Sequence, residues 1–271
     1  MNVFQAAVLG IVQGLTEFLP VSSSGHLAIL SLLTKQESTL AFSVFLHLAT
    51  FLAVCAVYYK DIWALIRAFF CFLPDKLKKR PARDPAYQHM LGMMILSLLP
   101  LVPIVFVKDQ IEAACSTPWV IGLALCGTAV LLFFADRFNN GKKTVADMTV
   151  RDALIIGLVQ MVAVIPGLSR SGATLTAALF CGLKREDAVK YSFILSLPTI
   201  VAAAVLEGAD LIKGGMASGS VLPYAAGFAV AAVTGYLAIG LVRMISKNGK
   251  LKYFSIYCAA LAAGLFLSYL F

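Results

Sequence analysis

Two short stretches of the sequence place polar and ionisable residues inside long apolar segments. The first, EFLPVSSSGH at residues 17–26, contains Glu17, three consecutive serines and His26, and the second, PGLSRSGAT at residues 166–174, contains Arg170 between two serines. A proline followed by serines favours the end of one helix and the start of another, because serine is a preferred N-cap. The free N–H groups and positive dipole of a helix N-terminus attract anions, phosphate above all. Each stretch is therefore predicted to be a phosphate-binding tip between two half-helices.

The ionisable side chains in these stretches favour phosphoryl transfer. Arg170 has the planar fork that grips a phosphate. Gln13 and Glu17 lie four residues apart, on one face of a helix, and offer oxygen ligands to Mg²⁺ or Ca²⁺. His26 is a candidate nucleophile or general acid, and Ser23 is a candidate nucleophile with His26 as its base. Two blander interpretations stay open: the serines only cap helix ends, and Glu17 forms a structural ion pair with Arg170.

The other two histidines carry weaker signals. His47 lies in the middle of an apolar run, after Phe45, and is expected to pack in the core or to line a cavity. His89 lies at the edge of an apolar run and is interpreted as interfacial.

The two polar stretches occupy matching positions in two copies of an internal repeat. At a constant offset of 147 residues the identical positions are Gly10 with Gly157, Gln13 with Gln160, Ser22 with Ser169, Ser24 with Ser171, and Gly25 with Gly172. The similarity continues with a shift of two residues, where FSVFLHLAT from Phe42 lies over YSFILSLPT from Tyr191. The copies differ at their ionisable positions, which pair Glu17 with Val164, His26 with Ala173 and Ser23 with Arg170. Shared residues are therefore expected to build the fold, and differing residues to carry the chemistry.

The composition is that of an integral membrane protein. Of the 271 residues, 60% are hydrophobic and 13% are charged, and the mean hydropathy is +0.88; soluble domains have about 45–50% apolar residues. Apolar runs that approach the roughly 17–25 residues needed to span a bilayer lie at Ala41–Tyr59, Met90–Val107, Trp119–Ala135, Tyr191–Leu206, Val221–Val242 and Tyr253–Phe271. No basic region precedes the first apolar run, so a cleaved signal peptide is not expected.

The basic residues indicate how the chain crosses the membrane. Eighteen of the 22 Lys and Arg residues lie in four connections, at 60–83, 137–151, 184–190 and 243–252. The positive-inside rule places these connections in the cytoplasm. Membrane topology, rather than a nucleic-acid partner, therefore accounts for the net charge of +8.

Two apolar segments, 2–33 and 152–182, are broken in the middle by Pro, Ser and Gly and are interpreted as re-entrant hairpins. A single crossing by the second segment would put the basic residues at 184–190 outside, against the charge pattern. Each repeat then holds one hairpin and three spanning helices, so the second copy is inverted and the two tips meet near the midplane. The predicted fold is one all-α polytopic membrane domain over residues 1–271, with six transmembrane helices and two re-entrant hairpins. Repeat one covers about 2–137 and repeat two about 152–271.

The stretches QGLTEFLPVSSSGH and PGLSRSGAT resemble the undecaprenyl-diphosphate phosphatase family, the bacitracin-resistance type of integral membrane phosphatase. The likeness covers essentially the whole chain. It implies hydrolysis of undecaprenyl diphosphate to undecaprenyl phosphate, which recycles a lipid carrier for cell-wall synthesis. It also implies a divalent cation, and an active site that faces the extracytoplasmic side of a bacterial plasma membrane.

The resemblance assigns roles position by position. The acidic motif of the family falls on Gln13 and Glu17, which would bind the metal, and its catalytic stretch falls on Ser23 and His26. With the arginine motif at Arg170, the expected substrate-binding residues are Gln13, Ser22, Ser24, Gly25, Ser169, Ser171, Gly172 and Thr174. Many members have Glu where this chain has Gln13, which leaves open whether Gln13 touches the metal or orients water or Glu17.

A transporter or lipid flippase is the alternative function, because inverted repeats and helix breaks at the midplane suit transport equally well. Hydrolysis is favoured because Ser23, His26 and Arg170 supply a nucleophile, an acid and a phosphate ligand. The expected partners are a prenyl diphosphate and membrane lipids, with no nucleic acid. Whether Ser23 or His26 attacks, which metal is preferred and whether the chain forms a homodimer stay open.

Overall fold

The computed structural model describes residues 1–34, 40–77, 84–115, 117–138, 141–214 and 221–270. Over these residues the chain is helical, and its one β-type contact is an isolated bridge between Lys143 and Leu183. Four of the described helices are long and apolar enough to cross a membrane, or five spans if one bent helix pair counts as a single span. The chain is therefore an all-α polytopic membrane protein, as the sequence predicts.

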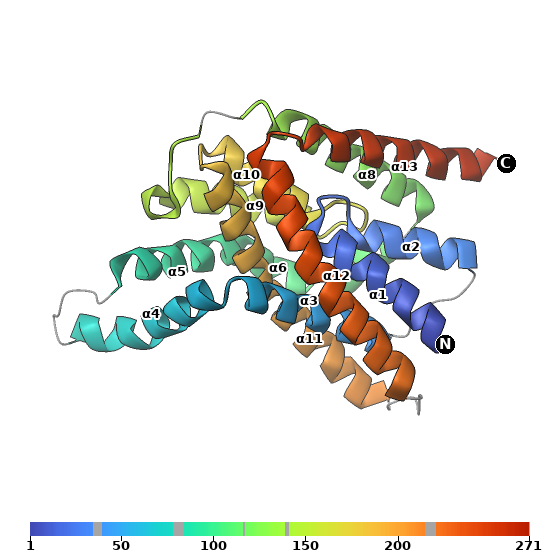
Figure 1. Cartoon of the computed structure of the whole chain (residues 1–271), viewed down its shortest axis with the longest axis horizontal. Coiled ribbons are helices and arrows are strands. Elements are labelled where there is room, and N and C mark those ends of the chain that lie inside the picture. Colours follow the sequence, from blue (N-terminus) through green and yellow to red (C-terminus); the bar gives the residue numbers. More distant parts are fainter. Residues whose placement is uncertain (35–39, 78–83, 116, 139–140, 215–220, 271) are drawn as a thin grey trace.

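Figure 1 shows the helices in chain order. They are α1 (Val3–Phe18), α2 (Ser23–Thr34), α3 (Leu40–Val57), α4 (Tyr59–Leu77), α5 (Pro85–Leu98), the 3₁₀ turn η1 (Leu99–Leu101), α6 (Val102–Val105), α7 (Lys108–Cys115), α8 (Pro118–Ala135), the 3₁₀ turn η2 (Val145–Asp147), α9 (Val150–Val162), α10 (Arg170–Phe180), α11 (Arg185–Gly214), α12 (Val221–Lys247) and α13 (Lys252–Leu270).

The six apolar runs of the sequence overlap α3, α5 with α6, α8, α11, α12 and α13. Two of these six runs do not form a single helix long enough to count as a span. The helix α3 is followed by α4 at an angle of 91°, and α13 is one of the shorter apolar helices. Length and composition thus support four or five of the six predicted spans. Residues 78–83 of the first basic connection and residue 271 of the last run lie outside the described residues.

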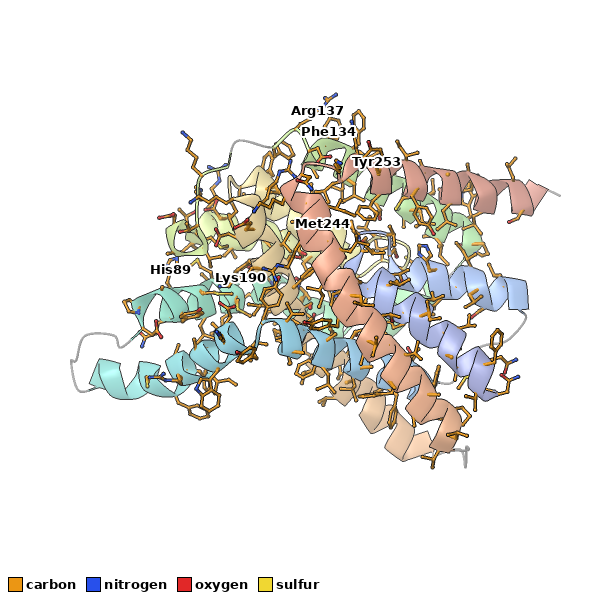
Figure 2. The ribbon with its side chains drawn as sticks, in the orientation of Figure 1. His89, Phe134, Arg137, Lys190, Met244 and Tyr253 are labelled. Atoms are coloured by element: carbon orange, nitrogen blue, oxygen red, sulfur yellow. The ribbon has the colours of Figure 1, made fainter. Side chains whose placement is uncertain are left out.

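The helix ends that flank the basic connections lie on one side of the molecule. In Figure 1 the end of α4 and the starts of α5, α9 and α13 lie along the left and upper edges, whereas the ends of α2 and α11 lie at the right and lower edges. At the upper edge, the Arg137 guanidinium stacks 5.2 Å from the centre of the Phe134 ring (Figure 2). Nearby, Arg185 pairs with Asp136 at 3.1 Å. This is the arrangement expected if the four basic connections share one side of the membrane.

Each polar stretch forms a turn between two helices, one between α1 and α2 and the other between α9 and α10. Ser22 Oγ accepts the backbone N–H of Gly25 at 3.2 Å, and Ser169 Oγ accepts that of Gly172 at 3.1 Å. The two hydrogen bonds occupy equivalent positions of the repeat, and both cap the helix that follows. The capping interpretation is therefore correct for Ser22 and Ser169.

The two turns, called the tips from here on (residues 19–22 and 163–169, each with the first turn of its following helix), brace each other. The backbone N–H of Gly167 donates to Ser24 Oγ at 3.2 Å, and Ser171 Oγ donates to the carbonyl of Leu19 at 3.5 Å. Ser24 and Ser171 are equivalent in the repeat, and each bonds to the backbone of the opposite tip, Ser24 as acceptor and Ser171 as donor. Figure 1 shows both tips near the middle of the molecule. Backbone groups freed by the helix breaks thus find protein partners, as depth in a membrane requires.

Glycines let the first half of each broken segment pack against a neighbouring helix. A Cβ atom on Gly10 of α1 would lie 2.5 Å from the carbonyl oxygen of Gly227 in α12. The repeat-equivalent Gly157 of α9 would place a Cβ 2.4 Å from the carbonyl oxygen of Ser97 in α5. Close backbone approach through small residues is the usual way in which membrane helices associate. These contacts fix α1 and α9, and with them the tips at their ends.

Replacing Gly10 by alanine is expected to destabilise the protein by about 1–3 kcal/mol, because the new methyl group meets backbone that cannot move aside. Thermal unfolding of the detergent-solubilised protein measures this change. Gly240→Ala is the matched control, because a Cβ at Gly240 of α12 would meet nothing within 4 Å. Equal melting temperatures for the two variants would contradict the close packing of α1 on α12.

Candidate active site

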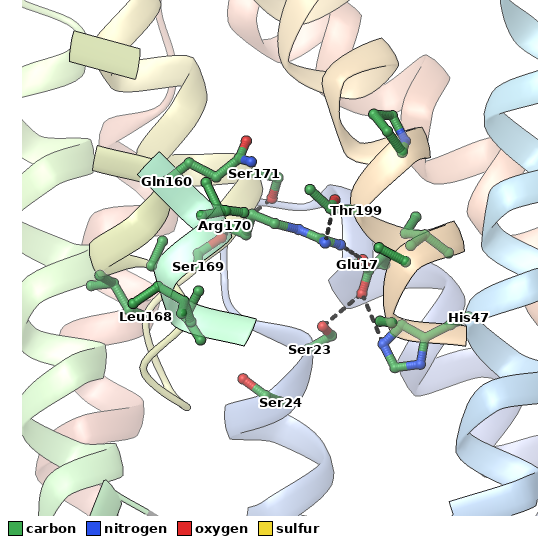
Figure 3. A pocket seen from close by; sticks show the side chains of 18 of the residues that line it. Glu17, Ser23, Ser24, His47, Gln160, Leu168, Ser169, Arg170, Ser171 and Thr199 are labelled. Carbon is green, nitrogen blue, oxygen red and sulfur yellow. Dashed lines mark hydrogen bonds and ion pairs between the residues drawn. The ribbon is translucent and has the colours of Figure 1, made fainter. Parts of the chain in front are cut away.

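Glu17 is the centre of the candidate site. It lies in the last turn of α1, and its side chain is 4% exposed. Its carboxylate accepts hydrogen bonds from Ser23 Oγ at 2.7 Å and from the Gln13 amide at 3.0 Å, and it forms an ion pair with Arg170 (Figure 3). The structure thus brings together Gln13, Glu17, Ser23 and Arg170 from two hairpins that are far apart in the sequence.

Arg170 crosses from the second hairpin to the first. It is the first residue of α10, and besides its contact with Glu17 it donates from Nη1 to Thr199 Oγ1 of α11 at 2.8 Å. Thr199 follows Pro198, which interrupts the hydrogen-bond ladder of α11 beside the site. The structural ion pair that the sequence left open is therefore present. Because a buried charge is costly without its partner, the pair holds the two tips together as well as orienting the guanidinium.

His47 is the residue whose importance the sequence analysis missed. Its Nδ1 lies 2.9 Å from the carbonyl of Ser43, and because a carbonyl only accepts, Nδ1 carries the proton of that hydrogen bond. The other ring nitrogen, Nε2, faces Glu17 Oε2 at 3.9 Å, too far for a direct hydrogen bond (Figure 3). His47 lines the cavity, as one of its two expected roles requires, and in addition faces the central carboxylate. The available signal was an ionisable residue at membrane depth, aligned with Ser196 in the other repeat.

The contacts of His26 in the structure are with Ser22 and Tyr257 rather than with Glu17, and its expected role in the reaction stays a prediction. Its Nδ1 donates to the carbonyl of Ser22 at 2.8 Å, and its Nε2 accepts from the Tyr257 hydroxyl at 2.7 Å. The His26 and Tyr257 rings also stack, with centroids 5.6 Å apart. Both ring nitrogens therefore have hydrogen-bond partners within the protein, and His26 is not among the residues that line the cavity beside Glu17.

A cavity of about 430 Å³ opens beside Glu17. Its polar end is formed by Thr16, Glu17, Ser22, Ser23, Ser24, His47, Gln160, Ser169, Arg170, Ser171 and Thr199. Its apolar wall is formed by Leu98, Leu101, Val102, Ile104, Val105, Ala163, Val164, Leu168, Pro198, Ile200, Ala202, Ala203 and Leu206. A charged end joined to a long apolar wall suits an amphiphile with an anionic head and a hydrocarbon tail.

Three other predicted residues, Gly25, Gly172 and Thr174, contact residues of the tips. A Cβ on Gly172 would lie 3.1 Å from Pro20 Cβ, so this glycine allows the tips to approach, whereas one on Gly25 would lie 3.4 Å from Gly167 Cα, an ordinary van der Waals contact. Thr174 donates to the carbonyl of Arg170 at 2.9 Å. Gly25, Gly172 and Thr174 do not line this cavity, although Thr174 lines a smaller one with Glu17 and Arg170, and their contact with substrate stays a prediction.

The oxygen donors at Glu17 and Gln13 fit a hard divalent cation. Among the described residues no group of three or more His, Cys, Asp or Glu side chains is placed to hold a metal. Gln13 Oε1, however, is buried and has no hydrogen-bond partner, and its amide adjoins the Glu17 carboxylate. An amide oxygen and a carboxylate, completed by phosphate oxygens and water, are ligands that Mg²⁺ and Ca²⁺ accept.

Comparison with known proteins gives consistent matches over nearly the whole chain. A family model described as bacitracin resistance protein BacA matches residues 6–264. A Methanococcus maripaludis protein named undecaprenyl-diphosphatase is 40% identical over 252 residues, which cover 93% of this chain and 94% of the relative. Undecaprenyl-diphosphatase 1 of Shouchella clausii is 37% identical over 270 residues, with 98% and 96% covered. An undecaprenyl-diphosphatase of Geotalea daltonii is 40% identical over 250 residues, with 92% of each chain covered.

Removing one member of the buried ion pair is expected to cost more stability than removing both. Arg170→Met leaves the Glu17 charge buried without its partner and should destabilise the protein by about 3–5 kcal/mol. The double variant Glu17→Gln with Arg170→Met should recover part of that loss. Denaturation of the two variants and of Glu17→Gln completes the cycle. Strictly additive losses would show that the two side chains do not depend on each other.

Proposed function

This chain belongs to the BacA family of bacitracin resistance proteins, and we propose that it hydrolyses undecaprenyl diphosphate to undecaprenyl phosphate and inorganic phosphate. The observation that carries this proposal is the position of the Ser23 hydroxyl, which donates to Glu17 beside the Arg170 guanidinium at the polar end of an apolar cavity. The relatives named undecaprenyl-diphosphatase support the same reaction and substrate. The product is a lipid carrier that cell-wall synthesis can use again.

The two parts of the cavity correspond to the two parts of this substrate. The diphosphate would lie between the tips, where Arg170 and the N-termini of α2 and α10 attract negative charge. The first isoprene units would lie against the apolar wall formed by α5, α6 and α11. Because the lipid tail stays in the membrane, the head group can be bound below the membrane surface.

Ser23 is the nucleophile in this proposal. Its Oγ attacks the terminal phosphorus, an O–P bond to Ser23 forms, and the bond from that phosphorus to the bridging oxygen breaks, so that undecaprenyl phosphate leaves. Glu17 Oε2 lies 2.7 Å from Ser23 Oγ and receives its proton. Arg170 stabilises the charge that develops on the transferred group. Attack by water on the phosphoserine then releases inorganic phosphate and restores the hydroxyl.

His47 can serve the water step. With Nδ1–H donated to Ser43, Nε2 is the ring's acceptor, and it faces the Glu17 carboxylate across a gap of 3.9 Å. A water molecule beside these two atoms can donate one O–H to each, because Nε2 and the carboxylate oxygen are both acceptors. In this proposal Glu17 takes the Ser23 proton and His47 takes the proton of the attacking water.

We further propose that Glu17 and Gln13 hold a divalent cation, Mg²⁺ or Ca²⁺. Support comes from the buried, unpartnered Gln13 Oε1, which belongs to the amide whose Nε2 donates to the Glu17 carboxylate. When bound, the cation would neutralise negative charge on the diphosphate.

The site is proposed to face the extracytoplasmic side of a multi-pass plasma-membrane protein with six spans and two re-entrant hairpins. With the four basic connections in the cytoplasm, α5 and α11 run outward. The cavity is lined by the far ends of the α5–α6 span and by the second half of the α11 span, from Pro198 to Leu206. α3 runs inward, and His47 lies in its first half. The directions of three helices thus support a cavity in the outer half of the membrane.

Detergent-purified protein is expected to release phosphate from a C55 or C15 prenyl diphosphate, with loss of release in EDTA and recovery on adding Mg²⁺ or Ca²⁺. Arg170→Ala and Ser23→Ala should each reduce kcat by at least about 10³-fold, as expected for a phosphate ligand and a nucleophile. Phosphate release by the wild-type protein, assayed over time, is the measurement. Binding of the substrate without release, in a folded sample, would favour the flippase instead.

The two histidines give a matched pair of variants. His47→Ala is expected to lower kcat by about 10²–10⁴-fold, because it removes a proton acceptor at Glu17. His26→Ala should keep kcat within about threefold of wild type, since His26 does not line the cavity and both its nitrogens already have partners, although it loses the Tyr257 contact and some stability. The opposite ranking, measured on samples of equal folded fraction, would restore His26 to the reaction.

A further inference from the structure

Gln160 is a buried residue beside the site to which no role has yet been assigned. It lies in α9, it is 1% exposed, and its amide nitrogen Nε2 is buried without a hydrogen-bond partner. Leaving such a donor unpaired costs about 1–3 kcal/mol. Native proteins rarely accept this cost, and a donor that lacks a partner in the unliganded chain points to a ligand that supplies one.

The internal repeat explains why this donor is free. Gln160 is equivalent to Gln13, whose amide nitrogen donates to Glu17, four residues further along α1. In the second copy, the residue four positions after Gln160 is Val164, which accepts nothing. The second hairpin has therefore kept the amide and lost the carboxylate that satisfies it in the first.

The free amide lies where an anionic head group would be. Gln160 lines the main cavity together with Arg170 and Ser171 (Figure 3). It also lines a small cavity of about 10 Å³, whose wall includes the ion pair together with Ser192 and Ser196. A neutral donor next to a guanidinium complements the oxygens of a phosphate, which accept several hydrogen bonds at once.

We propose that Gln160 is a substrate-binding residue that donates an amide N–H to a phosphate oxygen of the prenyl diphosphate. The inference rests on the proposed function and extends it, because it gives the second hairpin a neutral phosphate ligand in addition to Arg170. Gln160 pairs with the substrate in the way that Gln13 pairs with Glu17. The carboxylate acceptor of the first hairpin is thus replaced, in the second, by the oxyanion of the ligand.

The test combines binding and stability in the full-length, detergent-purified protein. The ligand is farnesyl methylenediphosphonate, a prenyl diphosphate analogue that resists hydrolysis, and its Kd is measured by titration calorimetry. Gln160→Met removes the donor and keeps the length of the side chain, and Gln160→Glu replaces the donor by an acceptor. Gln88→Met is the matched control, because Gln88 of α5 also has a buried, unpartnered Nε2 but lies outside both cavities.

Gln160→Met is expected to raise the Kd of the analogue about 10- to 100-fold, the range for a hydrogen bond to a charged group. Gln160→Glu should raise it further by like-charge repulsion. Because Nε2 bonds nothing in the unliganded chain, Gln160→Met should unfold at the wild-type temperature or above it. Gln88→Met should bind as the wild type does.

A structural role for Gln160 would give the reverse result. In that case Gln160→Met would unfold at a lower temperature and bind the analogue within about twofold of wild type, and the inference would be overturned while the phosphatase stands. Failure of the wild-type protein to release phosphate from a prenyl diphosphate is a separate result, which would overturn the proposed function and this inference together.

Discussion

The buried ion pair between Glu17 and Arg170 is the interaction on which the rest of the site depends. Neither charge is stable alone among apolar helices, so the pair sets the distance between the two hairpins. It also leaves the Ser23 hydroxyl bonded to the carboxylate and turned toward the cavity. In the proposed reaction, a diphosphate competes with Glu17 for the guanidinium, and the carboxylate becomes a better acceptor for the Ser23 proton as that competition proceeds.

Hydropathy and the internal repeat were enough to predict the class of fold and the two broken segments. They could not predict the 91° bend between α3 and α4. Sharp bends usually follow Pro or Gly, but the sequence around Tyr58 is AVYYK, which carries neither. Packing against neighbouring helices, rather than local sequence, must therefore decide where this helix turns. The breaks at the tips, in contrast, carry Pro20 and Pro166, and local sequence marked them.

In the candidate site, too, some features could be predicted from local sequence and others depend on packing. Glu17 and Arg170 were identifiable because ionisable residues at membrane depth need a reason to be there. For His26, closeness in sequence to Ser23 could not predict the direction of the ring, because its partner Tyr257 lies 231 residues away. The sequence marked His47 only as an ionisable residue at membrane depth, and its position opposite Glu17 depends on the packing of α3 beside the end of α1. The role proposed for Gln160 likewise depends on the lack of a hydrogen-bond partner for its Nε2, which no sequence pattern reveals.

The reciprocal braces between the tips have a consequence for how the protein is made. Ser24 and Leu19 of the first tip bond to Gly167 and Ser171, which follow roughly 150 residues later in the chain. At about 5–20 residues per second, a ribosome needs on the order of 10–30 s to supply them. During that interval the first hairpin lacks these partners, and Glu17 lacks Arg170. The hairpin's final conformation is therefore not stable in the hydrocarbon of the bilayer. Assembly in the bilayer should therefore keep the first hairpin at the water interface, or shielded by the insertion machinery, until the second hairpin arrives to lock it.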